Sequence, residues 1–203
     1  MIPVLAVVDA ERGAPQLARA LAAAGCEVLE AAPEVLAWAS SLGHHARIAG
    51  IVEAAALPRL VSPTVGLRLH GVADPGNVGT LVRSADVLGP AHIVLGEGCA
   101  DPLAPKAVRA SMGAIFRVPI VALADAPAAR GIALDARGKT PIWEADLALP
   151  VAFELGAERT GLPASIVDAA DCVAAIPLAP GGESLNVAMA GAIALYELRR
   201  RSS

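Results

Sequence analysis

Short apolar runs alternate along the chain with longer segments in which apolar residues recur every three or four positions. The runs are typical of buried strands, and the longer segments are typical of helices with an apolar face. This alternation predicts an α/β fold with a mostly parallel sheet and helices on both faces. Strands are predicted over 4–8, 27–29, 49–52, 65–69, 92–95, 118–123, 132–134, 151–155 and 173–176, and helices over 14–24, 33–42, 77–88, 106–111, 126–130, 163–169 and 184–200.

Two prolines interrupt this pattern about a third of the way along the chain. Pro58 and Pro63 punctuate the segment after the third predicted strand, and the alternation restarts beyond them. We therefore predict a small N-terminal α/β domain over residues 1–63 and a larger α/β domain over residues 64–203.

Three predicted strands end in polar or glycine-rich loops, which begin after Leu69, Leu155 and Ile176. Open parallel sheets bind their ligands beyond the carboxyl ends of the strands. The three loops are therefore the expected ligand-binding region.

The third loop leads into the last predicted helix, and it is the most informative of the three. Ser184 is a good N-cap residue, and Asn186 brings a second polar side chain to the same helix end, where backbone N–H groups are free to bind a ligand. A helix that is apolar nearly all round is normally buried, so we expect this helix to be buried at a packed interface. Its two apolar sides consist of Leu185, Met189, Ile193 and Tyr196, and of Val187, Ala190, Ala194 and Leu198.

The other two loops are less specific when each is taken alone. In the first, Asn77 is a fair N-cap residue for a helix that carries Arg83 in its second turn. In the second, Gly156 and Gly161 allow a close backbone approach around Glu158. An ordinary capped helix and an ordinary strand-to-helix turn explain these features equally well.

Composition excludes several classes of protein. Hydrophobic residues make up 55% of the chain and charged residues 18%, so disorder is not expected. We expect neither a membrane span nor a signal peptide, and we predict a cytoplasmic protein. The net charge of −4 argues against nonspecific coating of nucleic acid, although it leaves room for a local positive patch. Aromatic residues amount to 2%, too few for base-stacking platforms.

Cysteine and histidine spacing gives no indication of a metal site. Cys26, Cys99 and Cys172 are odd in number and far apart, so we interpret them as small buried hydrophobic residues. His44 and His45 are adjacent, which suits a loop or a helix end better than a chelate.

Taken together, the three loops resemble a known family. The segments DPGNVGTLVRSAD, LGAERTGLP and IPLAPGGESLNVAMAGAIALYE, in this order and spacing, resemble the three motifs of the SpoU/TrmH-type RNA ribose 2′-O-methyltransferases of the SPOUT superfamily. The segment KAVRASMGAIFRVPI between them is also similar to that family, and the resemblance covers residues 64 to the end. It implies an α/β knot with a C-terminal trefoil, S-adenosylmethionine as methyl donor, an RNA substrate (ribosomal or transfer RNA) and a homodimer.

The resemblance also implies roles for individual residues. Arg83 matches the family's catalytic arginine. Because arginine stays charged, we expect it to clamp a phosphate and to assist loss of the hydroxyl proton rather than to act as a simple base. In the dimer, Asn77 and Arg83 of one subunit would lie near the donor of the other. The remaining polar site positions match Asn77, Glu158, Ser184 and Asn186, and the donor-binding positions match Leu155, Gly156, Ile176, Leu178 and Leu185.

Three features depart from the family pattern. Pro180 and Arg159 stand where glycine is frequent in relatives; the first would stiffen the donor loop, and the second could add a phosphate contact. Residues 1 to about 62 resemble only the later part of the family's N-terminal RNA-binding domain, so we expect that domain to be truncated or rebuilt.

Two alternatives stay open at this stage. A non-catalytic relative that binds RNA or a protein partner would fit the acidic charge and the shortened N-terminal domain. A dehydrogenase-like nucleotide enzyme ranks last, because no G-x-G-x-x-G run stands between an early strand and helix. The motifs do not distinguish ribosomal RNA from transfer RNA, or housekeeping modification from drug resistance.

Overall fold

The computed structural model describes residues 3–39 and 46–202, so His44, His45 and the predicted end of the second helix lie outside the described residues. The chain forms two compact units, residues 1–57 and 58–203, and each is described by itself. The boundary predicted near residue 63 falls in the segment between the 3-10 turn η1 (Ala54–Ala56) and the first strand of the second unit, where the chain forms no helix or strand.

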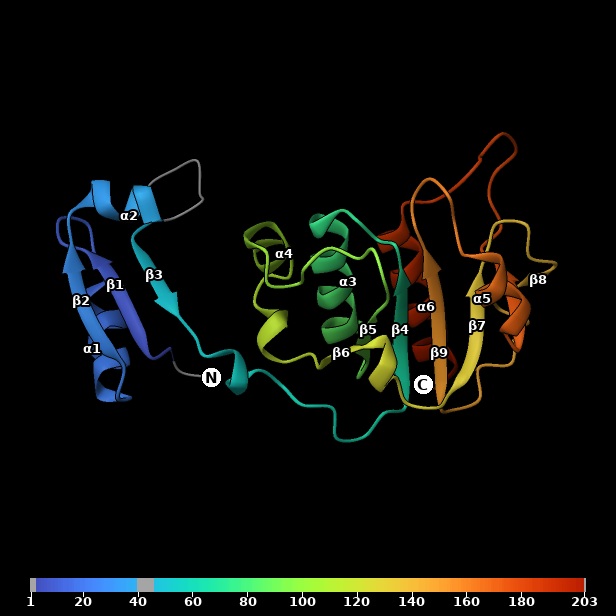
Figure 1. The fold of residues 1–203 in the computed structure, drawn as a ribbon, viewed down its shortest axis with the longest axis horizontal. Helices are drawn as coiled ribbons and strands as arrows, with labels where there is room; N and C mark the ends of the chain where they lie inside the picture. The colour runs from blue at the N-terminus through green and yellow to red at the C-terminus, as the bar shows by residue number, and fades with distance from the viewer. Residues whose placement is uncertain (1–2, 40–45, 203) are drawn as a thin grey trace. The chain divides into compact units, whose positions relative to one another are not determined.

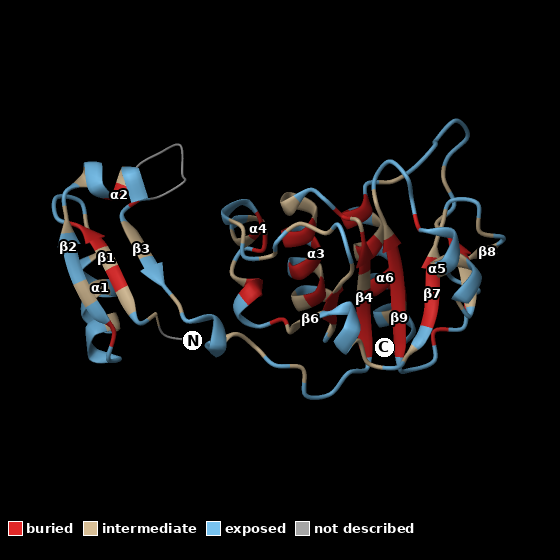
Figure 2. Ribbon diagram, viewed as in Figure 1, coloured by how far each residue is buried: buried red, intermediate tan, exposed pale blue. Residues whose placement is uncertain are grey.

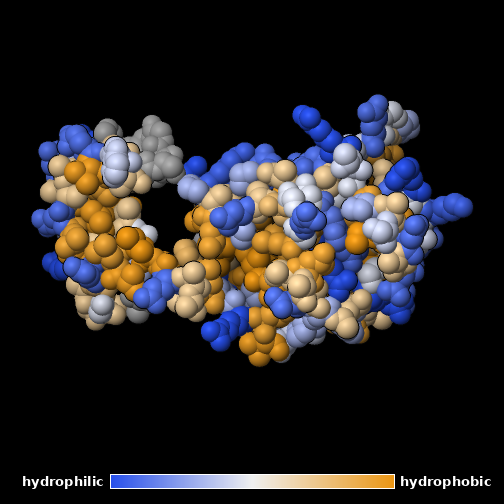
Figure 3. Space-filling model, viewed as in Figure 1, coloured by the Kyte–Doolittle hydropathy of each residue, from blue (hydrophilic) through white to orange (hydrophobic). Residues whose placement is uncertain are grey.

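The N-terminal unit is a small sheet with two helices. Its described strands are β1 (Leu5–Asp9), β2 (Glu27–Ala31) and β3 (Ile48–Ile51), in the order β2-β1-β3, with β1 parallel to β2 and antiparallel to β3. The helices are α1 (Pro15–Ala23) and α2 (Pro33–Ala39). Many apolar side chains of this unit stay at its surface, among them Leu29, Val35 and Trp38 (Figure 3).

The second unit is built on a parallel sheet, as the alternating pattern predicts. Its strands are β4 (Val65–His70), β5 (His92–Leu95), β6 (Ile120–Ala122), β7 (Arg130–Leu134), β8 (Thr140–Pro141), β9 (Val151–Gly156) and β10 (Cys172–Ala175). Within the described residues they run in the order β6-β5-β4-β9-β7-β10-β8, and every pairing is parallel. The central strands β4 and β9 are almost entirely buried, as Figure 2 shows.

Helices cover both faces of this sheet (Figure 1). The long helices α3 (Pro75–Leu88) and α6 (Val187–Arg201) pack together on one face, where Gly191 of α6 lies against Leu67 and Leu155. The short helix α5 (Ala164–Ala169) lies near β7 on the other face. Helix α4 (Pro105–Ala110) packs against α3. None of the helices in the described chain is long and apolar enough to cross a membrane.

Both long helices begin at residues other than those predicted. Asp74 caps α3, because its side chain accepts a hydrogen bond from the Gly76 N–H and Pro75 follows at the first helical position. Asn77 therefore lies inside the helix. Asn186 caps α6 by accepting from the N–H groups of Ala188 and Met189, so the prediction of Ser184 as N-cap was wrong.

Two short elements also differ from the predictions. The helix predicted over 126–130 is absent from this described segment. Ala126 is extended and β7 already begins at Arg130, so the three residues between them are too few for a turn of α-helix. Strand β8 was not predicted, because two residues carry no apolar pattern; its pairing with β10 forms it.

The prediction that α6 is buried all round was correct for one side only. Val187 and Ala194 are buried, whereas Met189 and Tyr196 are more than half exposed in the single chain. The knot predicted for this region stays a prediction.

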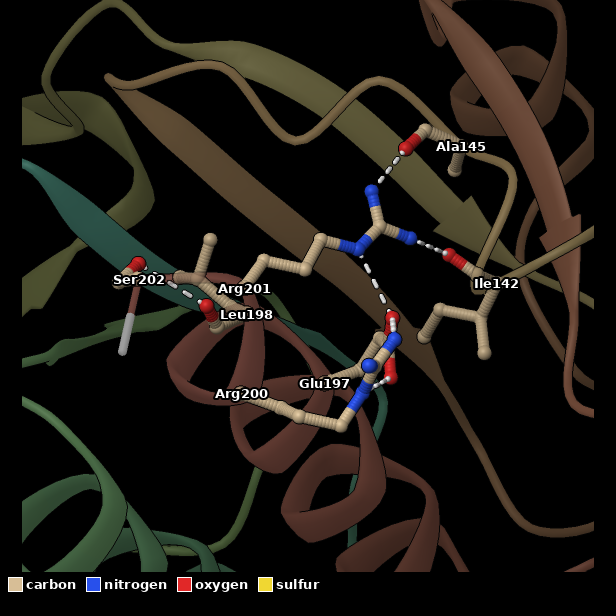
Figure 4. Close-up of polar contacts among 7 residues, drawn as sticks. All are labelled: Ile142, Ala145, Glu197, Leu198, Arg200, Arg201 and Ser202. Atoms are coloured by element: carbon tan, nitrogen blue, oxygen red, sulfur yellow. Dashed lines mark hydrogen bonds and ion pairs between the residues drawn. The ribbon is translucent and has the colours of Figure 1, made fainter.

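The last turn of α6 is fastened to the segment that precedes β9 (Figure 4). Glu197 Oε1 accepts hydrogen bonds from Arg200 Nη2 and Arg201 Nε, each at 2.8 Å. The two remaining Arg201 nitrogens donate to the carbonyl oxygens of Ala145 at 2.7 Å and Ile142 at 2.8 Å. These contacts fix the end of α6 and thereby the helix that carries Asn186 at its other end.

Candidate active site

The loops that follow three parallel strands line a cavity of about 430 Å³ at the carboxyl edge of the sheet, and the loop after β4 contributes no residue to its lining. Leu134 ends β7, Gly156 ends β9, and Ile176 directly follows β10; each of these residues lines the cavity. This position agrees with the rule for parallel sheets. All five predicted donor-binding positions lie on the lining: Leu155, Gly156, Ile176, Leu178 and Leu185.

A tight hairpin forms one wall of the cavity. Ala157 and Gly161 exchange two backbone hydrogen bonds of 3.1 and 2.9 Å. Gly161 has a φ of +70°, and a Cβ at Gly156 would collide with the backbone of Gly161. Both glycines are therefore required for this turn, and the turn holds Glu158 and Arg159 at the cavity.

A chain of hydrogen bonds joins the three predicted loops. Asn77 Nδ2 donates to Glu158 Oε1 at 2.6 Å, and Asn186 Nδ2 donates to Asn77 Oδ1 at 3.1 Å. Asn186 Oδ1 is already fixed by capping α6, so each member of the chain has its orientation set by the next. Segments up to 109 residues apart thus meet at one point.

The predicted polar residues do not all face the cavity. Glu158 and Ser184 line it, whereas Asn77 and Asn186 are absent from the lining and reach it through Glu158. Arg83 is exposed on α3 and does not line the cavity of its own chain. The polar chain therefore contains three of the five predicted polar residues.

Sequence reasoning missed one of the segments that line the cavity, the turn after β7. Leu134, Asp135 and Arg137 line the cavity, although this turn lies outside the three motifs. The signal was present, because a polar Asp-Ala-Arg-Gly segment follows a predicted strand. The hydrogen bond from Arg137 lowers the pKa of Asp135, so its carboxylate is charged at neutral pH.

A buried polar cluster supports the strands beneath these loops. Glu154 on β9 accepts from Arg68 Nη1 at 2.9 Å and is hydrogen-bonded to His70 Nε2 at 2.7 Å, and the side chains of Glu154 and His70 are each 7% exposed. Arg68 Nη2 also donates to the Pro127 carbonyl at 2.6 Å. Burial and the charge of Arg68 lower the pKa of nearby His92, which favours its neutral form. The cluster ties β4 to β9 where the first two loops leave the sheet.

The described residues contain no cluster of His, Cys, Asp or Glu that could hold a metal ion. A cavity of this size at the carboxyl edge of a parallel sheet, with a polar chain beside it, is typical of α/β proteins that bind a nucleotide- or cofactor-sized ligand.

Comparison with known proteins identifies the family. Residues 65–196 match the SpoU rRNA Methylase family model. The chain belongs to this family.

Individual relatives agree with this assignment. The chain is 37% identical over 146 residues to an uncharacterized tRNA/rRNA methyltransferase of Synechocystis, covering 68% of this chain and 53% of that protein. It is 35% identical over 141 residues to the 23S rRNA (guanosine(2553)-2′-O)-methyltransferase of Bacillus subtilis, covering 66% of this chain and 57% of that protein. The chain thus spans only about half the length of these curated relatives.

A solved structure is similar over nearly the whole chain. The AdoMet-bound rRNA methyltransferase from Sinorhizobium meliloti matches with a TM-score of 0.82 and 29% identity, covering 98% of this chain and 80% of that one. The similarity extends through both units, so the fold of the N-terminal unit also has a counterpart there.

Proposed function

We propose that the protein transfers a methyl group from S-adenosylmethionine to a ribose 2′-hydroxyl of ribosomal RNA or transfer RNA. The observation that carries this proposal is the hydrogen-bonded chain Asn186–Asn77–Glu158, which unites all three motifs beside the cavity. Family membership supports methyl transfer to RNA, and the Bacillus relative's name supports the 2′-hydroxyl as target.

The cavity fits the proposed donor. Leu155, Leu162, Ile176 and Leu185 offer an apolar wall for a flat adenine ring, and the polar hairpin offers hydrogen-bonding groups on the other side. The donor supplies an electrophilic methyl group on a positively charged sulfur. Acidic side chains on the lining, Glu158 and Glu183 among them, favour a cation in the cavity.

The protein's own residues would align and activate the ribose hydroxyl. A neutral hydroxyl is a weak nucleophile, so loss of its proton must accompany attack. Holding the hydroxyl in line with the methyl group supplies much of the rate enhancement. Asn77 and Asn186 fix Glu158 in one orientation, and the guanidinium of Arg83 clamps the adjacent phosphate and eases loss of the proton.

A second copy of the chain completes the site in this proposal. Arg83 does not line the cavity of its own chain, and the resemblance to the family implies that it lies near the donor held by a partner subunit. The exposed apolar side of α6, formed by Met189, Ile193 and Tyr196, provides the surface that two copies bury together. The function therefore requires a homodimer.

Methyl transfer to isolated RNA pools tests the proposal. The full chain is incubated with radiolabelled donor and with ribosomal or transfer RNA, and incorporation is compared with that of Arg83→Ala. We expect label in one pool for the wild type, and its loss in the variant with donor affinity unchanged. Donor binding without transfer to either pool would contradict the proposal and favour a non-catalytic RNA-binding relative, the alternative suggested by the net charge of −4.

A further inference from the structure

Asp135 and Arg137 form a bidentate ion pair on the turn after β7, outside the three motif loops. Arg137 Nε donates to Asp135 Oδ1 at 3.0 Å, and Arg137 Nη2 donates to Asp135 Oδ2 at 2.8 Å. The backbone N–H of Arg137 adds a third bond to Oδ1 at 2.8 Å. Both residues line the cavity. Parallel bonds of this kind hold a guanidinium in one plane.

The turn itself is held firmly against β10. The Asp135 N–H donates to the Ala174 carbonyl, and the Gly138 N–H donates to the Asp135 carbonyl. A Cβ at Gly138 would press on the backbone of Ala174, so the turn is packed closely on that strand. The Asp135 side chain is 11% exposed and that of Arg137 is 86% exposed. A mostly covered carboxylate therefore positions an accessible guanidinium at the cavity.

We propose that Arg137 binds the carboxylate of the donor's methionine portion. The donor joins an apolar adenine to a zwitterionic amino acid, so its site needs an apolar wall and a cation for the carboxylate. In the described part of the chain no acceptor meets Nη1 of Arg137, which leaves its two N–H groups for a ligand. Because Asp135 already orders the arginine, binding costs little side-chain entropy.

Asp135 acts through Arg137 and is a positioning residue. Both of its oxygens accept from Arg137, so it does not bind the donor directly. The other arginine on the lining, Arg159, lies on the hairpin and provides a matched control. Asp135→Asn keeps the size of the side chain but weakens its hold on the guanidinium.

Two ligands that differ only in the amino-acid portion test this inference by calorimetry on the full chain. S-adenosylhomocysteine carries the carboxylate, whereas 5′-methylthioadenosine lacks the amino-acid end. We expect Arg137→Ala to weaken the binding of S-adenosylhomocysteine about 10-fold or more, the loss typical of a charge-assisted hydrogen bond. The same variant should weaken the binding of 5′-methylthioadenosine less than about threefold. Asp135→Asn should cause a smaller selective loss, and Arg159→Ala should leave the ratio of the two affinities unchanged.

The inference rests on the proposed donor but not on the RNA target, so the two can fail separately. An unchanged affinity ratio in Arg137→Ala, or an equal loss for both ligands, would overturn it while leaving the donor site intact. A selective loss in Arg159→Ala alone would assign the carboxylate to the hairpin instead and overturn it as well. Failure of the wild-type chain to bind either ligand would overturn both this inference and the proposed function.

Discussion

At the scale of single residues, Asn77 is the middle member of the contacts that join the three loops: it donates to Glu158 and accepts from Asn186. The three loops were predictable because each follows a strand end, where parallel sheets place their ligands. Which side chains bond to one another was not predictable, because Asn77 and Asn186 are 109 residues apart in sequence. The N-cap residues also differ from those predicted: Asp74 caps α3 in place of Asn77, and Asn186 caps α6 in place of Ser184.

Asn77 joins Glu158 to Asn186 without lining the cavity, so its removal should separate catalysis from donor binding. We expect Asn77→Ala to lower kcat about 100-fold, a loss typical of a misplaced catalytic group. The dissociation constant for S-adenosylhomocysteine should change less than about threefold, the effect of one weak hydrogen bond. Steady-state kinetics and calorimetry provide the two values. A large loss of donor affinity with kcat preserved would show that Asn77 serves the donor cavity instead.

Glu154 neutralises Arg68 and is hydrogen-bonded to His70 in a buried setting, so its loss should destabilise the fold. Glu154→Ala leaves the partly buried guanidinium of Arg68 without its carboxylate partner, and we expect a cost of about 3 kcal/mol in the free energy of unfolding. Urea denaturation measures this value. Glu154→Gln retains hydrogen-bonding capacity and should cost less. Equal stability of Glu154→Ala and the wild type would show that the cluster is not a stabilising link between β4 and β9.

At the scale of elements, the alternating pattern predicted nine of the strands and most of the helices. The errors have local causes: β7 begins at Arg130 and leaves too few residues for the helix predicted over 126–130, and β8 exists only through its pairing with β10. The turn after β7 was missed as a site because it lies outside the three motifs, although its strand was predicted. In a parallel sheet, the carboxyl end of any strand can contribute to the site, whether or not a glycine-rich motif follows it.

The stability that the contacts at the C-terminal end of α6 contribute should depend on pH, because the Glu197 carboxylate takes part in them. Hydrogen bonds from Arg200 and then Arg201 lower the pKa of Glu197 from 4.5 to about 2. A carboxylate whose pKa falls on folding adds stability above its unfolded pKa, and this stability is lost as the pH falls through the folded value. We expect Glu197→Gln to be less stable than the wild type near neutral pH, with the difference shrinking between about pH 5 and pH 2.

Thermal unfolding of both proteins across this pH range measures the Glu197 effect. Arg130→Gln, which removes an exposed ion pair with Asp146 elsewhere in the same unit, serves as the matched comparison. A stability difference that stays constant from neutral to acid pH would mean that the Glu197 charge does not contribute.

At the scale of the whole molecule, α6 can be buried on all sides, as predicted, only if a second copy of the chain covers its exposed side. Its apolar pattern predicted burial all round, yet the single chain buries only the side that faces the sheet. A pattern of residues cannot distinguish burial within a chain from burial between chains, because both remove apolar surface from water. The knot and the shortened N-terminal domain were implied by the resemblance, and both stay predictions.

Tyr196 lies on the exposed side of α6 and is 57% exposed, so it tests the dimer without disturbing the core. We expect Tyr196→Glu to shift the protein from dimer to monomer in sedimentation experiments and to abolish methyl transfer. Its far-ultraviolet spectrum should be unchanged, since glutamate is a good helix former. Val61→Asp, at an exposed apolar position in the segment before β4, should remain dimeric and active. An active monomer would show that Arg83 serves its own chain.

The central claim is the chemical position of the transferred methyl group. RNA methylated by the wild-type protein can be digested to nucleosides and analysed by mass spectrometry against the Arg83→Ala control. The account predicts a nucleoside with its extra methyl on the ribose, present with the wild type and absent with the variant. A methyl group on the base, or no methylated nucleoside in any ribosomal or transfer RNA, would contradict it.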